Sequence, residues 1–457
     1  MVVSFQEAVE RLENGAIMPE HEFDLRVGQL ARKYVKEFGI KMNPEEVVNS
    51  DDGLADSAFQ AAQQLFVELG VYCTNTGRVA KFTEGEAKEA INSYPTKLEF
   101  GEGKEKGFMT PRQVEDRAPP WVNFSAVGTP VPSSQFVTVM RSYAQEPLAN
   151  AFSGPSLLEL NGRVVRSGAP VEVEAALFNV RSTREAARLA GRPGLGSHNL
   201  VGCAEKTAAV LAALHPDFGV RKTDGVFVAA LGEMKVDYER LNKVPFLQDA
   251  GYHTGGLYGP LMGGYAGGAA ETALVLLAHF YLGRLMFRAE FSNCFPLNIR
   301  ETCNTTPEML WLVSLVSQAM RRNTNAMHTM NAFLSSGPCT EMITYELAAH
   351  SIAATVSGAH LNPAAPARNK YPERCSGMEA RIHAEVGHAV ARSGIKRAEA
   401  NKIVKKLLEK YESKIRDAPV GKKFSECYDL RTVKPSQEYL DIYANTKRFL
   451  ADLGLVV

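Results

Sequence analysis

The stretch "AGRPGLGSHNL", residues 190–200, leads through three glycines and a proline to a single histidine, His198. Glycine reaches positive φ without a steric penalty, so this stretch favours a sharp turn just before the histidine. A histidine placed there could be a metal ligand, a proton donor or a hydrogen-bonded cap on a strand. Its ordinary pKa near 6.5 suits proton transfer at neutral pH, so we take His198 as the candidate catalytic residue.

Other polar and aromatic side chains follow short apolar runs further along the chain. No HxH or HExxH spacing occurs among the histidines, so we expect no metal site. A metal-dependent hydrolase that uses His198 with His253 or His360 is the alternative that these residue types leave open. The candidates found in this way are Tyr252, His253, Tyr258, Glu290, Asn293, Arg300, His328, Asn331, His360 and Asn362.

Eight strand-like runs, from about residue 120 onward, alternate with helical stretches and end in Gly, Ser, Asn or Pro. Such alternation predicts βαβ units and an α/β fold, and eight units predict a closed (β/α)8 TIM barrel of roughly 250 residues. Active sites in these barrels lie at the carboxyl ends of the strands. We therefore expect His198 at the mouth, after the third strand, with Arg300 and Asn331 beside the same cavity.

Flanking segments complete the predicted organisation. "NPEEVVNSDDGLADSAFQAAQQLFVELG" has apolar residues at helical spacing, so residues 1–115 are interpreted as an N-terminal helical extension. Residues 116–395 would form the barrel catalytic domain. "IKRAEANKIVKKLLEKYESKIRD" reads as an amphipathic helix, so residues 396–457 would be a C-terminal helical segment packing on the barrel.

Composition narrows the class of protein. The 457 residues carry 51 basic and 51 acidic side chains, which argues against a nucleic-acid-binding face. Seven scattered cysteines without a CxxC pair indicate reduced thiols. The N-terminus lacks an apolar signal core, and the apolar run 272–283 is shorter than the ~20 residues of a membrane span. We expect a cytoplasmic protein with no membrane partner.

Several motifs, in order along the whole chain, resemble the monomethylamine:corrinoid methyltransferases of methylotrophic archaea. The resemblance implies a (β/α)8 barrel with an N-terminal helical extension, assembled as a homohexamer. It implies a methyltransferase that moves a methyl group from a methylated amine to the cobalt of a corrinoid. That corrinoid (cobalamin) is carried by a separate small protein, so no cofactor bound tightly to this chain is expected. The motifs are "YCTNTGR" (72–78), "AGRPGLG" (190–196), "GGYAGG" (263–268), "GPCTEM" (337–342), "SGMEAR" (376–381), "APVGKKFSECYD" (418–429) and "TKRFLADLGLVV" (446–457).

The chain departs from the family at the opening stretch. Counting along "AGRPGLGSH" places His198 where the family has pyrrolysine, and histidine has no electrophilic carbon with which to hold an amine. By the same register, two pocket glutamates of the family fall on Phe227 and Leu257, and a pocket glutamine falls on Asn331. Tyr265, Arg300 and Glu341 keep the family register, which implies a location in the pocket.

These departures bear on the methyl donor. A neutral amine is a poor leaving group, and a site without its carboxylates and pyrrolysine lacks the means to activate one. A donor that is already activated, most plausibly a quaternary amine, needs neither group and binds over aromatic faces. Arg300 could bind a donor carboxylate bidentately, and glycines between 255 and 268 would leave a broad mouth. The expected aromatic wall consists of Phe227, Tyr252, Tyr258, Tyr265 and Phe333.

His198 would then be either a general acid toward the leaving heteroatom or a hydrogen-bond donor to the substrate. A third interpretation of the chain is a non-catalytic hexameric homologue that keeps the barrel without the chemistry. Methyl-donor turnover separates it from a corrinoid-dependent methyltransferase, and metal analysis separates both from a hydrolase.

Overall fold

The structure is a computed structural model that describes residues 3–126, 128–202 and 204–457. Its centre is a parallel five-stranded sheet in the order β12-β14-β16-β18-β19, beside a parallel pair, β6 and β8. The parallel α/β arrangement predicted from the sequence is therefore present. The strands are β6 (Asn123–Ser125), β8 (Ala151–Ser153), β12 (Gly225–Ala229), β14 (His253–Tyr258), β16 (Phe291–Cys294), β18 (Met327–Phe333) and β19 (His360–Ala365).

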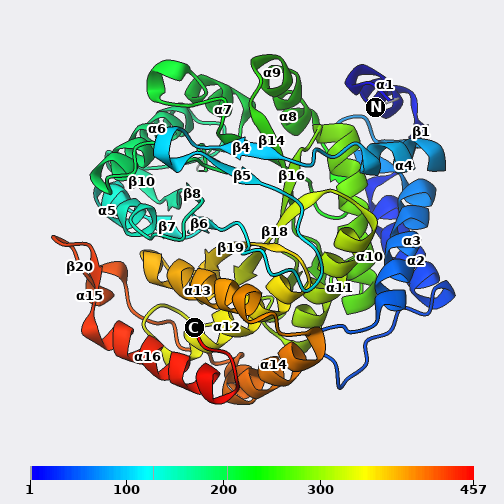
Figure 1. Ribbon diagram of the computed structural model, residues 1–457. Coiled ribbons are helices and arrows are strands. Elements are labelled where there is room, and N and C mark those ends of the chain that lie inside the picture. The colour runs from blue at the N-terminus through cyan, green and yellow to red at the C-terminus, as the bar shows by residue number, and fades with distance from the viewer. Residues whose placement is uncertain (1–2, 127, 203) are drawn as a thin grey trace.

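Backbone contacts link the pair to both edges of the five-stranded sheet. Val122 forms a parallel bridge with Leu361, which connects β6 to β19. Ala151 forms a parallel bridge with Gly196, and the N–H of Gly225 donates to the carbonyl of Ser197 at 2.7 Å. The segment before His198 thus lies between β8 and β12. Figure 1 shows the strands arranged around a common axis, with helices outside them.

The outer helices have the sequence signals that start a helix. Thr306 caps α11 by accepting from the N–H of Met309, and Pro307 occupies the first helical position. Ser376 and Glu379 form a capping box at the start of α13. The outer helices are α5 (Ser133–Ala144), α6 (Pro170–Leu189), α10 (Ala269–Leu282), α11 (Pro307–Asn323), α12 (Glu341–Val356) and α13 (Gly377–Ser393).

One segment, Ala269–Phe287, is long and apolar enough to cross a membrane, and 83% of it is buried inside the protein. This segment contains α10, which contacts the N-terminal helices α2 (Glu20–Glu37) and α3 (Asp52–Leu69). Its apolar surface on several sides is therefore covered by protein, as in the core helix of a folded domain.

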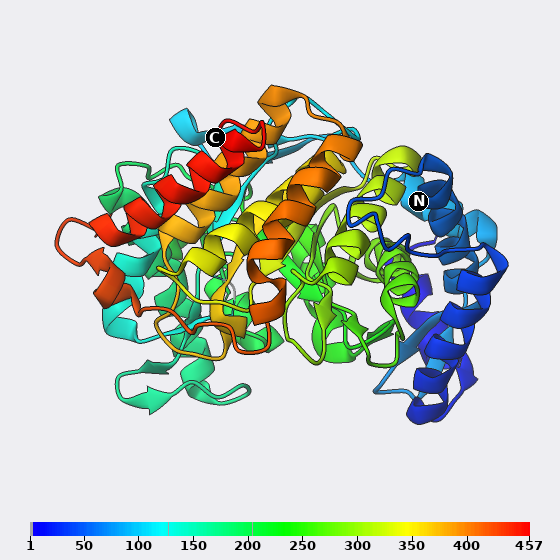
Figure 2. The same ribbon diagram turned by 90° about the horizontal axis from the view of Figure 1, so that it is seen from below.

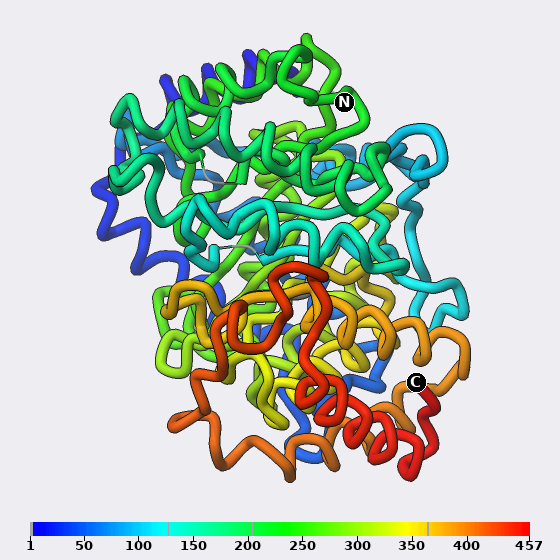
Figure 3. The backbone as a smooth tube through the Cα atoms, turned by 90° about the vertical axis from the view of Figure 1, so that its left-hand side faces the viewer, coloured from blue at the N-terminus to red at the C-terminus, as the bar shows by residue number. Residues whose placement is uncertain are grey.

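The N-terminal region also contributes to the base of the strands. After α4 (Glu84–Asn92), a hairpin of β4 (Leu98–Phe100) and β5 (Gly107–Met109) runs across the face seen in Figure 1. At the other end of the chain, α14 (Arg397–Tyr411) and α16 (Gln437–Asp452) pack on α12. Figures 2 and 3 show these C-terminal helices gathered on one side, away from the N-terminal helices.

Candidate functional site

His198 lies on an aromatic floor at the amino ends of the strands. Its Nε2 accepts a hydrogen bond of 2.9 Å from the indole Nε1–H of Trp121, just before β6. Its ring centroid lies 4.8 Å from that of Phe100, in the hairpin, and 4.9 Å from that of Phe291, the first residue of β16. The expectation that His198 projects at the mouth is therefore wrong, because the imidazole turns toward the floor that the hairpin closes.

Burial decides the protonation of this histidine. Desolvation, with a contribution from the nearby His253, lowers the pKa of His198 to about 3. The imidazole is therefore neutral at pH 7, and Nε2 acts as an acceptor, so the ring proton is on Nδ1. Nδ1 has no hydrogen-bond partner among the described residues. The pKa near 6.5 expected for a general acid does not apply, whereas a donor role for Nδ1–H remains open.

A layer of hydrogen-bonded polar side chains lies one step along the strands from this floor. Asn362 accepts from Nδ2 of Asn123 at 3.0 Å and donates to Oδ1 of Asn293 at 2.9 Å. The hydroxyl of Thr329 donates to the same Oδ1 at 2.8 Å. We call Asn123, Asn293, Thr329 and Asn362 the amide layer. These side chains are fully buried and cross-link β6, β16, β18 and β19.

Asn331 stands two residues beyond Thr329 on β18, on the same face of the strand, and pairs in register with Asn362. It is 1% exposed, yet neither its Oδ1 nor its Nδ2 has a hydrogen-bond partner among the described residues. Leaving a buried polar group unsatisfied costs about 1–3 kcal/mol, so such groups mark places where a ligand or water completes the bonding. Of the predicted site residues on the inner face, Asn331 therefore keeps both side-chain polar atoms available for a further hydrogen bond.

The strands on either side of Asn331 carry no charged side chains. The seven parallel strands contain no Asp, Glu, Lys or Arg. Leu257 is half-buried and lies opposite Asn293 in the register of β14 and β16. Phe333 ends β18 and stacks on Phe295 with ring centroids 5.9 Å apart. Phe227 belongs to the floor instead, 5.7 Å from Phe291.

Most of the other predicted site residues lie elsewhere. Tyr252 lies just before the amino end of β14, and its hydroxyl donates to the carbonyl of Leu214 at 2.9 Å. Tyr258 turns outward and stacks on His279 of α10 at 5.5 Å. Tyr265 is 52% exposed, and Arg300 and Glu341 are also exposed. Of the expected aromatic wall, the structure brings only Phe227 and Phe333 to the inner face.

Three of the glycines that were expected to widen the mouth, Gly255, Gly256 and Gly259, lie against aromatic rings instead. A Cβ on Gly255 would lie 2.5 Å from the ring of Phe227, and one on Gly259 would lie 2.1 Å from the ring of Phe295. Gly256 likewise faces the hydroxyl of Tyr258. These glycines are needed because aromatic rings pack directly on the backbone.

The strand histidines lie at the amino ends rather than the carboxyl ends. His253 and His360 are the first residues of β14 and β19, and His328 is the second residue of β18. His253 pairs with Glu290 at 3.1 Å and contacts the carbonyl of Glu99. Among the residues that the structure describes, no three His, Cys, Asp or Glu side chains form a group that could hold a metal ion.

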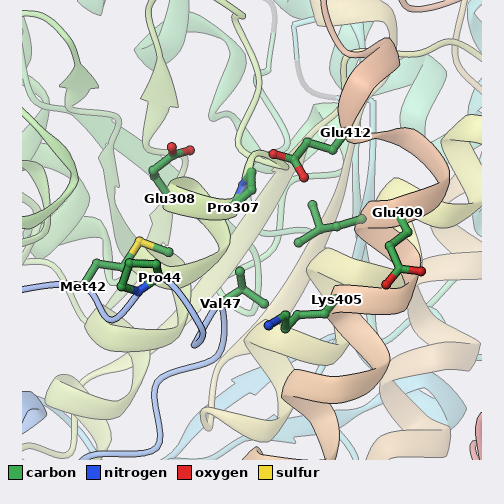
Figure 4. Close-up of a pocket in the computed structure, with 9 residues that line it drawn as sticks. Met42, Pro44, Val47, Pro307, Glu308, Lys405, Glu409 and Glu412 are labelled. Carbon is green, nitrogen blue, oxygen red and sulfur yellow. The ribbon is translucent and has the colours of Figure 1, made fainter.

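Two surface cavities lie away from the amide layer. One, of about 510 Å³, is lined by Met42, Val47, Glu308, Glu409 and Glu412, among other residues (Figure 4). None of the predicted site residues lines it. A second, of about 320 Å³, includes Tyr252, His253 and Glu290 at the amino ends of the strands.

Sequence patterns alone did not single out Trp121, Phe100 or Glu346. Glu346 is a fully buried carboxylate that accepts from the N–H groups of Ser335 and Ser336, both at 2.9 Å, and from the hydroxyl of Thr305 at 2.6 Å. It thereby holds the turn that follows β18. The "SSGP" turn (335–338) followed by a helical glutamate was the available signal for it.

Comparison with known proteins decides the family. A profile of the monomethylamine methyltransferase MtmB matches residues 3–455. The chain belongs to the monomethylamine methyltransferase family. It is 31% identical to monomethylamine methyltransferase MtmB1 of Methanosarcina barkeri over 451 residues, which are 98% of this chain and 97% of the relative. MtmB of Methanosarcina mazei is 30% identical over the same shares.

Solved structures agree with this placement in the monomethylamine methyltransferase family. The crystal structure of the Methanosarcina barkeri enzyme matches with a TM-score of 0.95 at 30% identity, covering 99% of this chain and 98% of the other. A hydroxylamine complex of MtmB matches equally well. The prediction that the protein is a methyltransferase is confirmed.

Proposed function

We propose that this member of the family is a pyrrolysine-free methyltransferase that moves a methyl group from a quaternary amine to the Co(I) of a corrinoid protein. The absence of acidic side chains from the seven parallel strands carries the proposal. Leu257 and Phe227 stand where the family resemblance implies carboxylates, and apolar side chains cannot protonate or neutralise a simple amine. The corrinoid, held by a small partner protein, supplies the cobalt nucleophile.

We infer further that the eight strand positions close into a (β/α)8 barrel. The bridges Val122–Leu361 and Ala151–Gly196, with the hydrogen bond from Gly225 to Ser197, support closure on both sides of β6 and β8. On this interpretation the segment 196–198 is the third strand, and the amide layer is one of the side-chain layers that fill such barrels.

We place His198 at the position of pyrrolysine, on the register of "AGRPGLGSH". Its low pKa and its bond to Trp121 favour a positioning role over proton transfer. The neutral ring orients the floor, and its Nδ1–H can donate toward the interior. Asn331 would then contact the donor directly, through a side-chain amide that has no partner among the described residues.

The charge and the N–H groups of the methyl donor distinguish the candidate donors from one another. Monomethylammonium carries N–H groups that need acceptors, and burying its charge without paired acceptors costs several kcal/mol. A quaternary ammonium has no N–H to satisfy and gains about 0.5–2 kcal/mol from each aromatic face. Phe333 and Phe295, stacked at the end of β18, offer such faces beside Asn331. Methyl transfer from such a donor moves no proton, so an uncharged site is sufficient.

A donor screen tests the proposal. The purified protein, its corrinoid protein in the Co(I) state and matched mono-, di-, tri- and quaternary methylamines would be followed by the visible spectrum of methylcobalt formation. We expect quaternary amines to react fastest. Monomethylamine reacting at least as fast as every quaternary donor would overturn the donor assignment. No turnover with any donor would favour the non-catalytic homologue, and hydrolysis that depends on added metal would favour the hydrolase.

Assembly and location complete the proposal. We expect the hexamer implied by the family resemblance and a cytoplasmic site of action, where the reducing environment keeps Co(I) available. Six cysteines that the structure describes are free and buried, in keeping with such an environment. Light scattering of the purified protein measures the oligomeric state directly.

A further inference from the structure

Two buried arginines approach each other around Gly358, at the amino ends of the strands and on the opposite side of β18 from the amide layer. A Cβ on Gly358 would lie 2.6 Å from Cγ of Arg321 and 2.9 Å from the carbonyl oxygen of Gln113, the residue after Arg112. Arg112, which follows β5, is 2% exposed, and Arg321, near the end of α11, is 5% exposed. His328 of β18, 1% exposed, completes the group. Successive side chains on a strand point to opposite faces, so His328 points away from Met327 and Thr329, its inward neighbours.

The hydrogen bonds of the two arginines are incomplete. Arg112 donates from Nη1 to the carbonyls of Thr355 at 3.0 Å and Ala359 at 2.7 Å, but its Nε has no acceptor among the described residues. Arg321 donates from Nη2 to the carbonyls of Met320 and Thr324, while its Nε and Nη1 have none. His328 has a contact with the backbone of Ala326, and neither ring nitrogen has another partner within the described part of the chain.

Little negative charge lies near the two arginines and His328. Burial and the charge of Arg112 lower the pKa of Arg321 to about 10, and no carboxylate among the described residues offsets them. Asp116 acts on Arg112, but its carboxylate already accepts from the N–H groups of Gln113 and Ala118 at 2.9 Å each. Burial and the two guanidiniums together lower the pKa of His328 to about 3, although a hydrogen bond with the backbone of Ala326 opposes the shift.

We propose that Arg112, Arg321 and His328 form a buried binding site for a small monovalent inorganic anion of chloride's size. Guanidinium Nε–H and Nη–H groups and an imidazole N–H are all donors, which is the set that an anion accepts. Buried cations are strongly unfavourable unless an opposite charge accompanies them. Because each of the three side chains is almost fully enclosed, the site suits a monatomic ion better than phosphate or an organic acid.

Such an anion would stabilise the base of the fold. It would join the end of α11 to β18 and to the segment 112–118, which leads into β6. A ligand that binds only the folded state raises stability in proportion to the logarithm of its concentration. The site lies on the other face of β18 from Asn331, so its occupancy does not depend on the methyl donor.

Bromide, which scatters anomalously, provides a direct probe. Crystals of the full chain grown in gluconate and soaked in bromide should show an anomalous peak within hydrogen-bonding distance of Nε or Nη1 of Arg321. In solution at constant ionic strength, replacing gluconate by chloride should raise Tm by roughly 2–3 °C at a hundredfold excess over Kd. A water molecule in place of bromide, or equal Tm in both salts, would overturn the proposal.

A matched pair of variants separates this site from general salt effects. Arg321→Met removes the charge and should abolish the chloride response. Arg322→Met, its neighbour on α11, breaks partly exposed ion pairs with Asp52 and Asp56 and should keep that response. If Arg321→Met does not fold, the bromide map of the unchanged protein decides. A chloride response of the same size in Arg321→Met as in the parent would refute the site.

Discussion

The indole Nε1–H of Trp121 donates to Nε2 of His198 across 2.9 Å, and the two rings are nearly parallel, with an interplanar angle of 4°. This contact joins Trp121, two residues before β6, to the segment before β12. It also fixes His198 as an acceptor at Nε2, which a protonated imidazole could not be. The chemistry open to His198 is therefore set by Trp121 and by burial.

Replacing His198 tests that relationship. His198→Ala removes the acceptor for Trp121 and leaves a cavity, so we expect a loss of about 2–4 kcal/mol in the free energy of unfolding. His198→Gln keeps an acceptor and should recover part of that loss. Urea denaturation of His198→Ala, Trp121→Phe and the double variant measures the coupling between the two side chains. A coupling energy of zero would contradict the hydrogen bond.

The pH profile of kcat for methyl transfer should contain no inflection that comes from His198. Since its pKa is about 3, the ring stays neutral between pH 6 and 9, and kcat should not follow its titration. The same profile measured for His198→Gln should have the same shape at a lower rate. A kcat inflection near pH 6.5 that disappears in His198→Gln would instead establish a general acid.

Acid should destabilise the protein through its buried histidines. The pKa values of His198, His328 and His350 are lowered to about 3 by burial, against 6.5 in the unfolded chain. Below pH 6.5 the unfolded state therefore binds more protons at these histidines. Their contribution to stability falls by up to about 1.4 kcal/mol per pH unit for each histidine, and it is constant above pH 7.

Urea midpoints between pH 8 and 5 measure this dependence. His350 and His383 contact each other at 3.0 Å, so His350→Gln should flatten the slope. His215→Gln, at an exposed position, is the control and should leave the slope unchanged. A pH slope in His350→Gln equal to that of the parent would show that His350 is not buried as described.

Asn331 should affect donor binding without supporting the fold. Because its amide has no partner among the described residues, Asn331→Leu should leave the unfolding free energy unchanged or raise it, while KM for the donor rises about tenfold. Asn362→Leu is the matched control, since it breaks two bonds of the amide layer and should cost about 1–3 kcal/mol. Steady-state kinetics and thermal unfolding of both variants check the contrast. Equal destabilisation by the two substitutions would count against a ligand-facing Asn331.

Substitution of Leu257 should change which methyl donor the enzyme prefers. Leu257→Glu introduces a carboxylate at a half-buried position opposite Asn293, so the ratio of monomethylamine to quaternary amine turnover should rise. Leu257→Gln has the same shape without the charge and should leave the ratio near that of the parent. Competition between the two donors, read by methylcobalt formation, measures the ratio. A rise of equal size in both variants would show that shape, rather than charge, selects the donor.

Local sequence patterns were sufficient for the order of the elements. Alternating apolar runs and capping residues such as Thr306 and Ser376 report on hydrogen bonds within a few residues, so they predict helices and parallel strands. The motif order was likewise sufficient for the family, because a shared ancestor preserves residues along the whole chain. The absence of acidic residues from the strands is visible in the sequence once the strands are known.

Only the tertiary structure decided which way each side chain faces and what lies against it. Tyr258 and Leu257 are adjacent in sequence but point to opposite faces of β14. Tyr258 therefore packs on α10 and does not belong to the predicted aromatic wall. His198 turned to the floor because a hairpin from residues 98–109 brings Phe100 beneath it, about a hundred residues away in the chain. The pKa of His198 and the burial of Arg112 and Arg321 arise from such distant contacts, since desolvation depends on all surrounding segments and not on neighbours in sequence.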